Sequence, residues 1–254
     1  MKSVLVACWK GGEPVMNLGE WFNEIILRRL GYGIRYWPSD CIEPDEPPLM
    51  MIGSEFHAKA VNKILKRSRA VHVWGQGNGR PEEKPVNPKD YDGRVIVHGL
   101  RGPITAEVSG VRGVPLCDPG WLLPPEWRPH SHGDRILYVP HWQQYRGGEQ
   151  IHVLMPRDAV EPTMRRIVLA DFVMTSTLHT MIACLAYSTP CALHSPGPLN
   201  MPQKWADVLG EVPRNCKTVE EGRQWWRDVG CRIRPPSDLD AFMDAFPHHL
   251  ARET

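Results

Sequence analysis

The strongest chemical signal in this chain lies at residues 175–179, where an apolar, strand-like segment meets a helix-like one. The sequence there is Thr175-Ser176-Thr177-Leu178-His179, so hydroxyl groups precede the expected helix and His179 falls in its first turn. Free N–H groups and the helix dipole favour an anion at such a position. Ser176 and Thr177 add hydroxyl donors, and an imidazole can exchange a proton near neutral pH. We therefore predict an anion site with His179 as its central residue; a histidine buried for structural reasons is the alternative.

Three further candidates complete this group: Arg101 and His141 follow strand-like segments, and Asp118 precedes the proline-rich stretch. Arg101 stands just before Pro103, a favoured first residue of a helix, so its guanidinium suits a carboxylate or phosphate held at that helix N-terminus. His141 is a candidate proton donor or phosphate contact. Asp118 precedes a proline, which is typical of a turn, or it reaches a cleft as a base. A surface arginine and a loop histidine are the alternatives for the first two.

Two glycine-containing turns complete the set. In Asn17-Leu18-Gly19-Glu20, Asn17 is a good N-cap and Glu20 stands where it would complete a capping box, or this helix N-terminus faces a ligand. Gly75 and Gly77 follow another strand-like segment, where glycine lets the backbone approach a ligand closely or simply forms a turn. Their spacing is not that of a dinucleotide fingerprint, which argues against such a cofactor.

Strand-like and helix-like segments alternate along the chain, which predicts an α/β fold with parallel sheets flanked by helices. The expected strands are residues 3–8, 34–37, 49–52, 71–74, 95–98, 136–139, 152–154, 172–175 and 191–194. The expected helices are residues 18–30, 55–65 (with Ser54 as N-cap), 179–187, 219–228 and 238–250. Ligands collect at the carboxyl ends of strands in such sheets, where the candidate residues stand.

A proline-rich stretch divides the chain. Residues 125–133 are predicted to be a linker between an N-terminal half, residues 1–124, and a C-terminal half, residues 134–254, which includes the last helices. The cleft between two such halves is the expected ligand site.

Composition narrows the function classes. The 254 residues carry a net charge of +1, so no global basic field favours nucleic acid as a partner. The seven cysteines lack C-x-x-C spacing and form no zinc pattern with histidine, so we expect free thiols and neither a metal nor another cofactor. The N-terminal apolar run is too short for a signal peptide, and no segment is long enough for a membrane span. We expect a cytoplasmic protein, with loose association at the inner face of the membrane compatible with the sequence; its oligomeric state is not predicted.

The ordered set of these motifs resembles the polysaccharide pyruvyl transferases, especially the short bacterial exopolysaccharide ketal-pyruvate transferases. The resemblance runs from about residue 17 to residue 207. It rests on Asn17-Leu18-Gly19-Glu20, Trp74-Gly75-Gln76-Gly77, Arg101-Gly102-Pro103, Asp118-Pro119-Gly120, Pro140-His141, Ser176-Thr177-Leu178-His179 and Lys204-Trp205-Ala206-Asp207.

The resemblance implies two Rossmann-like lobes in a GT-B-like arrangement, with the acceptor on the N-terminal lobe and the donor on the C-terminal lobe. It implies transfer of the enolpyruvyl group of phosphoenolpyruvate to a sugar or lipid-linked glycan as a ketal, with release of phosphate. The donor site would be Arg101, His141 and the turn from Ser176 to His179. Glu20 replaces the family's usual aspartate. Thr177 replaces an arginine found in many members, so the missing charge is assigned to Lys204 and Arg101.

On this hypothesis His179 protonates the methylene carbon, Asp118 or Glu20 accepts a hydroxyl proton, and Trp9, Trp121 or Trp142 stacks on the acceptor sugar. A GT-B-type glycosyltransferase using a nucleotide sugar is one alternative. Such enzymes often read the ribose with an acidic residue, and no Asp or Glu occurs between Asp171 and Asp207. A non-catalytic sugar-binding module is the other alternative.

Overall fold

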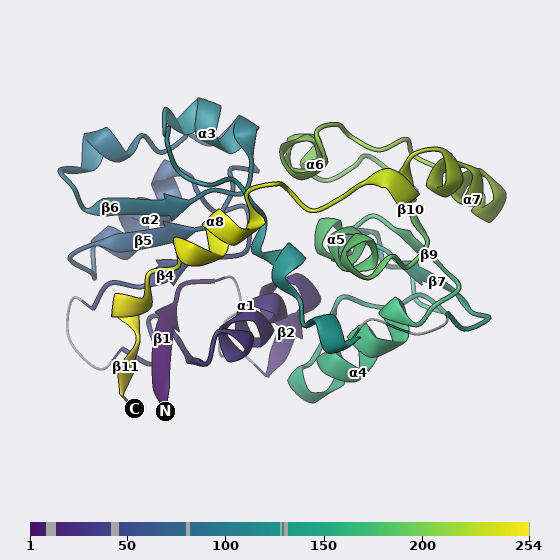
Figure 1. Cartoon of the computed structure of the whole chain (residues 1–254), viewed down its shortest axis with the longest axis horizontal. Helices are drawn as coiled ribbons and strands as arrows, with labels where there is room; N and C mark the ends of the chain where they lie inside the picture. Colours follow the sequence, from purple (N-terminus) through teal and green to yellow (C-terminus); the bar gives the residue numbers. More distant parts are fainter. Residues whose placement is uncertain (9–13, 42–45, 80–81, 128, 130–131, 254) are drawn as a thin grey trace.

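A five-stranded parallel sheet with one added antiparallel strand forms the larger part of the α/β fold (Figure 1). The computed structural model describes residues 1–8, 14–41, 46–79, 82–127, 129 and 132–253. The parallel strands are β1 (Lys2–Val6), β3 (Gly33–Tyr36), β4 (Leu49–Met50), β5 (Val71–Trp74) and β6 (Val95–Gly99). Helices α2 (Ala58–Leu65) and α3 (Pro103–Ser109) belong to this half, and Pro103 is the first residue of α3, as predicted.

A smaller parallel sheet is formed by the second half. Its strands are β7 (Ile136–Val139), β9 (Phe172–Thr175) and β10 (Cys191–Leu193), with β9 in the middle. The helices of this half are α4 (Arg157–Val168), α5 (Leu178–Tyr187), α6 (Pro202–Leu209) and α7 (Val219–Asp228). The chain also has 3-10 turns at Pro88–Tyr91, Pro119–Leu122, Pro125–Trp127, Trp142–Gln144, Gly230–Arg232 and His248–Leu250.

The strand predicted at residues 152–154 is displaced and pairs differently. The structure has β8 (Leu154–Pro156), which pairs antiparallel with β2 (Val15–Asn17) in a separate ladder. A backbone bond from Leu18 N to Val153 O, 2.9 Å long, extends this ladder to the first residue of helix α1 (Leu18–Arg29). The ladder therefore fixes the start of α1 against the second half of the chain.

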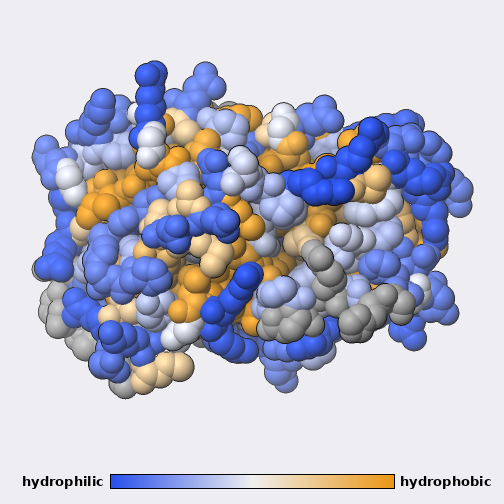
Figure 2. Space-filling model, viewed as in Figure 1, coloured by the Kyte–Doolittle hydropathy of each residue, from blue (hydrophilic) through white to orange (hydrophobic). Residues whose placement is uncertain are grey.

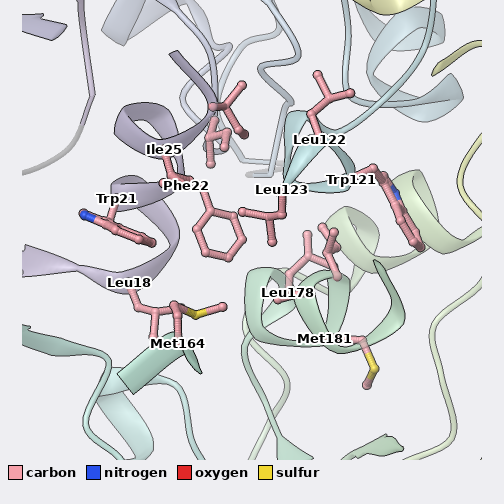
Figure 3. Close-up of a cluster of buried hydrophobic side chains, with 14 of the residues drawn as sticks. Leu18, Trp21, Phe22, Ile25, Trp121, Leu122, Leu123, Met164, Leu178 and Met181 are labelled. Atoms are coloured by element: carbon pink, nitrogen blue, oxygen red, sulfur yellow. The ribbon is translucent and has the colours of Figure 1, made fainter. Parts of the chain in front are cut away.

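Helix α1 lies at the centre of the protein. Its residues from Leu18 to Leu27 are all buried, so it has no solvent face over that length. Asn17 caps it as predicted, accepting a hydrogen bond from Gly19 N at 2.9 Å. Figure 3 shows its Phe22 beside Leu123 and above Leu178 at the start of α5, in one cluster of buried apolar side chains. This packing holds the N-termini of α1 and α5 in a fixed relation.

Helix α2 begins later than predicted. Ser54 is not its N-cap: His57 takes that place and accepts a hydrogen bond from Ala60 N. The preceding residues are held extended by bridges that pair Glu55 with Asn78 and His57 with Pro85. Pairing with residues that are distant in sequence thus keeps this segment extended, so the helix begins later.

The C-terminal tail corrects the predicted division of the chain. After α7 it crosses to the large sheet as α8 (Leu239–Asp244), and β11 (Arg252–Glu253) pairs antiparallel with β1, so both termini lie together (Figure 1). Phe242 stacks on Trp74 with ring centroids 4.3 Å apart, and its carbonyl accepts a hydrogen bond from the indole of Trp74. Apolar residues gather in the middle of this face of the molecule (Figure 2). The tail therefore packs on the N-terminal half, because an amphipathic pattern specifies an apolar face but not the sheet that it covers.

The remaining predictions concern a membrane span, the cysteines and the linker. Within the described ranges, no helix is both long and apolar enough to cross a bilayer. All seven cysteines are free thiols, and four of them are buried. The predicted linker begins with the turn Pro125–Trp127, in which Trp127 stacks on Trp21 at 5.8 Å; residues 128, 130 and 131 lie outside the described part.

Candidate functional site

A pocket of about 420 Å³ opens where the N-termini of α1 and α5 meet. We call it the central pocket. It is lined by residues 17–20, 53–55, 141–143 and 177–180, with Glu82, Val153, Asn200, Met201 and Lys204. The N-terminus of α5 directs free N–H groups at this cavity, since Thr177 forms no side-chain cap. The N–H groups of Leu18 and Gly19 at the start of α1 are already bonded to Val153 and Asn17. The positive dipole ends of both helices favour an anionic ligand.

His179 lines this pocket, and Asp118 lies buried behind it. The Nε2 atom of His179 lies 3.7 Å from Oδ2 of Asp118, and neither atom has a hydrogen-bond partner among the described residues. The other oxygen of Asp118 accepts a hydrogen bond from Gly120 N at 2.8 Å, which holds the carboxylate in place. The imidazole packs edge-on against Phe22 with centroids 5.8 Å apart. A carboxylate that faces one ring nitrogen leaves the other for a substrate, as in an acid–base dyad.

The position of the His179 ring depends on Gly19. A Cβ atom at residue 19 would lie 2.3 Å from Nδ1 of His179 and 3.0 Å from its Cγ. The N-terminus of α1 thus approaches the imidazole so closely that only glycine fits. Residues 19 and 179, far apart in sequence, become two sides of one site.

If His179 acts in proton transfer, Gly19→Ala should lower turnover by about 10²-fold, because the imidazole must move from its position. The helix itself tolerates alanine, so the circular dichroism spectrum and melting temperature should stay close to those of the wild type. Gly222→Ala is the control for packing strain, since residue 222 is a buried helical glycine outside the pocket lining. A Cβ atom there would lie 3.0 Å from core atoms of Ala192, Met174 and Phe172, so this variant should lose stability but not turnover. Activity of the Gly19→Ala variant equal to that of the wild type would show that the position of His179 does not matter.

Lys204 supplies the cation of the central pocket. It is half-buried on α6, and its Nζ atom lies 3.5 Å from Oδ1 of Asn200. Burial, with a smaller contribution from the charge of Arg101, lowers the pKa of Lys204 to about 8. The ammonium is therefore still charged at neutral pH, but a bound anion would stabilise it considerably.

His141 stands at the pocket as a neutral ring. Burial and the nearby charge of Lys204 lower its pKa to about 4. Its Nδ1 accepts a hydrogen bond from Gln143 N, so the neutral ring carries its proton on Nε2. At neutral pH the ring therefore carries no charge and offers a hydrogen bond to a ligand; its role as a proton donor stays a prediction.

Arg101 does not line the pocket, and the prediction that it holds the substrate anion is wrong. The residue is only 3% exposed, and its guanidinium donates to Oδ2 of Asp207 at 3.0 Å and to oxygens of Gly53, Ser54 and Asn78. The carboxylate of Asp207 also accepts from the backbone N–H of Thr105 in the first turn of α3. An anion does occupy the predicted place beside Arg101 and this helix N-terminus, but it is the protein's own Asp207.

Three other predicted contacts serve packing instead of lining the pocket. A Cβ atom at Gly75 would lie 2.2 Å from Pro119, and one at Gly77 would lie 2.1 Å from the guanidinium of Arg101, so protein atoms occupy the space expected for a ligand. The hydroxyl of Ser176 donates to the side chain of Gln144 at 2.6 Å and accepts from His141 N at 2.8 Å. Thr177, by contrast, does line the pocket.

Several pocket residues carry no signal in the sequence. Thr180 lies one turn into α5, and its buried hydroxyl has no hydrogen-bond partner among the described residues. Glu55 and Glu82 join Glu20 at the pocket from separate loops. The carboxylates thus come from the first half of the chain, whereas Lys204 and the histidines come from the second. The only signal in the sequence that could have placed Glu55 near this edge of the sheet is the alternation of strands and loops.

The tryptophans predicted to stack on the acceptor sugar lie in different surroundings. Trp142 is exposed and lines the pocket, whereas Trp121 is buried in the apolar cluster beside α5 (Figure 3) and is not available to a sugar. Trp9 lies outside the described residues. In the ranges that the structure covers, no group of three or more His, Cys, Asp or Glu side chains is placed to hold a metal ion.

Comparison with known proteins gives a fold relationship only. No family model and no curated protein matches the chain. A crystal structure from Klebsiella pneumoniae subsp. pneumoniae NTUH-K2044, of a protein described as functionally uncharacterized, superposes with a TM-score of 0.51 at 11% identity. The match covers 85% of this chain and 93% of that one. The two proteins share an α/β fold.

Proposed function

We propose that this chain is a phosphoenolpyruvate-dependent pyruvyl transferase that forms a ketal on a sugar of an exopolysaccharide or lipid-linked precursor. In this proposal the two parallel sheets are the lobes of a GT-B-like arrangement, and the central pocket is the active site. The observation that carries it is the His179–Asp118 pair, set beneath two converging helix N-termini and accompanied by Lys204. An acid–base group beside receptors for an anion is what protonation of an enol phosphate requires.

The donor would be held by charge and by hydrogen bonds. Lys204 and the free N–H groups of α5 would bind the phosphate and carboxylate of phosphoenolpyruvate, with the dipole of α1 adding to the attraction. His141 would donate from Nε2, and the unpaired hydroxyl of Thr180 would add another donor. Glu20, Glu55 and Glu82 would repel the anion and accept hydrogen bonds from hydroxyls, so they favour the sugar on their side of the pocket.

The reaction then follows in balanced steps. His179 gives a proton to the methylene carbon, and the buried carboxylate of Asp118, 3.7 Å from Nε2, orients the ring. A sugar hydroxyl attacks the resulting cationic carbon and loses its proton to a base, for which Glu20 is the candidate. The carbon–oxygen bond to phosphate breaks with its electron pair, and a second hydroxyl closes the ketal. The proton of this second hydroxyl leaves with the phosphate, and the base returns the proton of the first hydroxyl to His179.

The proposal is tested by incubating the chain with isotopically labelled phosphoenolpyruvate and a panel of free and lipid-linked bacterial glycans. We expect release of inorganic phosphate in proportion to label incorporated into a glycan, and no release without the glycan. Consumption of a nucleotide sugar with no dependence on phosphoenolpyruvate would identify a glycosyltransferase instead. Binding of glycans with no turnover of either donor would identify a sugar-binding module.

The titration of Lys204 predicts a pH dependence of donor binding. The group is charged below its pKa of about 8 and neutral above it, so affinity for phosphoenolpyruvate should fall as the pH rises past 8. Binding on that alkaline limb should take up a proton, because the bound anion raises the pKa of Lys204. Calorimetric titrations from about pH 7 to about pH 10 measure both effects.

The matched variants separate Lys204 from other basic groups. Lys204→Arg should keep affinity across the alkaline range, because a guanidinium remains charged there. Lys217→Arg, at an exposed position, should leave the fall unchanged. An affinity that is constant up to about pH 10 in the wild type would remove Lys204 from the donor site.

A further inference from the structure

A second cavity, of about 610 Å³, adjoins the central pocket. We call it the side pocket. It lies at the carboxyl ends of β7 and β10 and is lined by Tyr138 and His194 and by the loops that follow these strands. Ligand sites of open α/β sheets lie at this edge, and small-ligand pockets span about 300–1,000 Å³.

The loops around the side pocket are fixed by one side chain. Gln144, in the loop after β7, accepts a hydrogen bond from the hydroxyl of Ser176 at 2.6 Å. Its amide nitrogen donates to the hydroxyl of Ser195 at 2.8 Å and to the carbonyl of Pro198 at 3.0 Å, both in the loop after β10. The loops that follow all three strands are thus joined, so the cavity is already formed without a ligand.

The lining of the side pocket suits an uncharged, hydroxyl-rich ligand. No carboxylate is among its lining residues in the part of the chain that the structure describes, whereas the central pocket has three. Its one charged lining residue among the described residues, Arg146, donates to the carbonyls of Gln143 and Tyr145 in its own loop. The amides of Gln143 and Gln150 can each donate and accept hydrogen bonds, as sugar hydroxyls do. The ring of Tyr138 is 37% exposed and packs edge-on against His194, at 6.0 Å, which leaves an aromatic surface for a sugar ring.

The two pockets share part of their walls. His141, Gln143 and Asn200 line both cavities. Asn200 donates to Oε1 of Gln143 at 3.2 Å and lies 3.5 Å from the ammonium of Lys204. A molecule in the side pocket would therefore lie directly beside a donor bound at Lys204.

We infer that the side pocket binds an uncharged saccharide unit of the acceptor glycan, next to the sugar that receives the pyruvyl group. That it belongs to an acceptor rests on the proposed function; that it binds a saccharide rests on the lining alone. The inference moves one acceptor contact to the C-terminal half, whereas the resemblance implied an acceptor bound by the N-terminal half.

Ligand-observed NMR tests the inference with methyl glycosides and disaccharides of glucose, galactose and mannose as probes. We expect saturation transfer to at least one disaccharide in the wild type. Tyr138→Ser should raise its Kd about tenfold, and Gln150→Ala should raise it by a smaller factor. Ile136→Ser is the matched control: residue 136 is on the same strand and 41% exposed, but it does not line the pocket.

The outcomes separate this inference from the proposed function, because phosphoenolpyruvate binding is measured on the same samples. The inference is overturned if no saccharide binds the wild type, or if Tyr138→Ser and Gln150→Ala bind as the wild type does. It is also overturned if uridine or adenosine nucleotides bind in a Tyr138-dependent manner while saccharides do not. Saccharide binding that depends on Tyr138, without any binding of phosphoenolpyruvate, would support the subsite and refute the proposed donor.

Discussion

On the proposed function, the His179→Gln variant is expected to lose about 10²–10⁴-fold in kcat for pyruvyl transfer, which is the usual contribution of a positioned acid. Glutamine has a similar length and a polar end, but it cannot give up a proton in the pH range in which an imidazole does. The loss should appear in kcat more than in KM, since Lys204 and the helix N-termini are unchanged. Phosphate release under saturating phosphoenolpyruvate measures it.

A structural role for His179 would give a different result. The imidazole packs on Gly19 and Phe22, so a packing residue would show its loss as a lower melting temperature with activity falling in parallel. His132→Gln, at an exposed position, is the control for the substitution itself. Near-wild-type turnover in a folded His179→Gln variant would rule out His179 as the acid.

The Arg101→Leu variant is expected to lose about 3–5 kcal/mol in free energy of unfolding, because it leaves the carboxylate of Asp207 buried without its cation. The side chains of both partners are almost fully buried, so water cannot replace the lost contact. The same carboxylate accepts hydrogen bonds from Thr105, so α3 and α6 would be weakened together. Urea unfolding measures the change.

A second substitution separates charge from packing. Asp207→Asn in the Arg101→Leu background removes the unpaired charge while keeping an oxygen that can cap α3, so part of the lost stability should return. Glu161→Gln, which breaks an exposed pair with Arg165, should cost less than about 1 kcal/mol. A loss that small for Arg101→Leu would contradict the assignment of Arg101 as the buried anchor of Asp207.

Local patterns in the sequence predicted much of the fold. The strands at residues 71–74, 136–139 and 172–175 and the helix at residues 219–228 have the predicted bounds. These segments form regular apolar runs or an amphipathic period, and neighbouring turns limit them. The pairing of Val15–Asn17 with Leu154–Pro156 was not predictable in this way, because a three-residue strand has too short a pattern and its partner lies more than a hundred residues away.

Some of the predicted site residues line the central pocket and others do not, and the difference has a physical reason. His141, Thr177, His179 and Lys204 do line one pocket, because residues after parallel strands meet at the same sheet edge. Arg101 follows the same rule and stands at the correct edge, but α6 brings Asp207 against it. Sequence position shows which edge a side chain reaches; it does not show whether another segment of the chain has already filled the place. The same limit explains why Gly75 and Gly77 contact protein atoms.

Calorimetric titration of the wild-type chain with phosphoenolpyruvate is the measurement on which the proposed function depends most. We expect saturable binding that inorganic phosphate competes with and that Lys204→Ala weakens about tenfold or more. UDP-glucose, as a representative nucleotide sugar, should give no binding at the central pocket. Binding of the nucleotide sugar together with no response to phosphoenolpyruvate would contradict the proposal and identify the pocket as that of a different transferase.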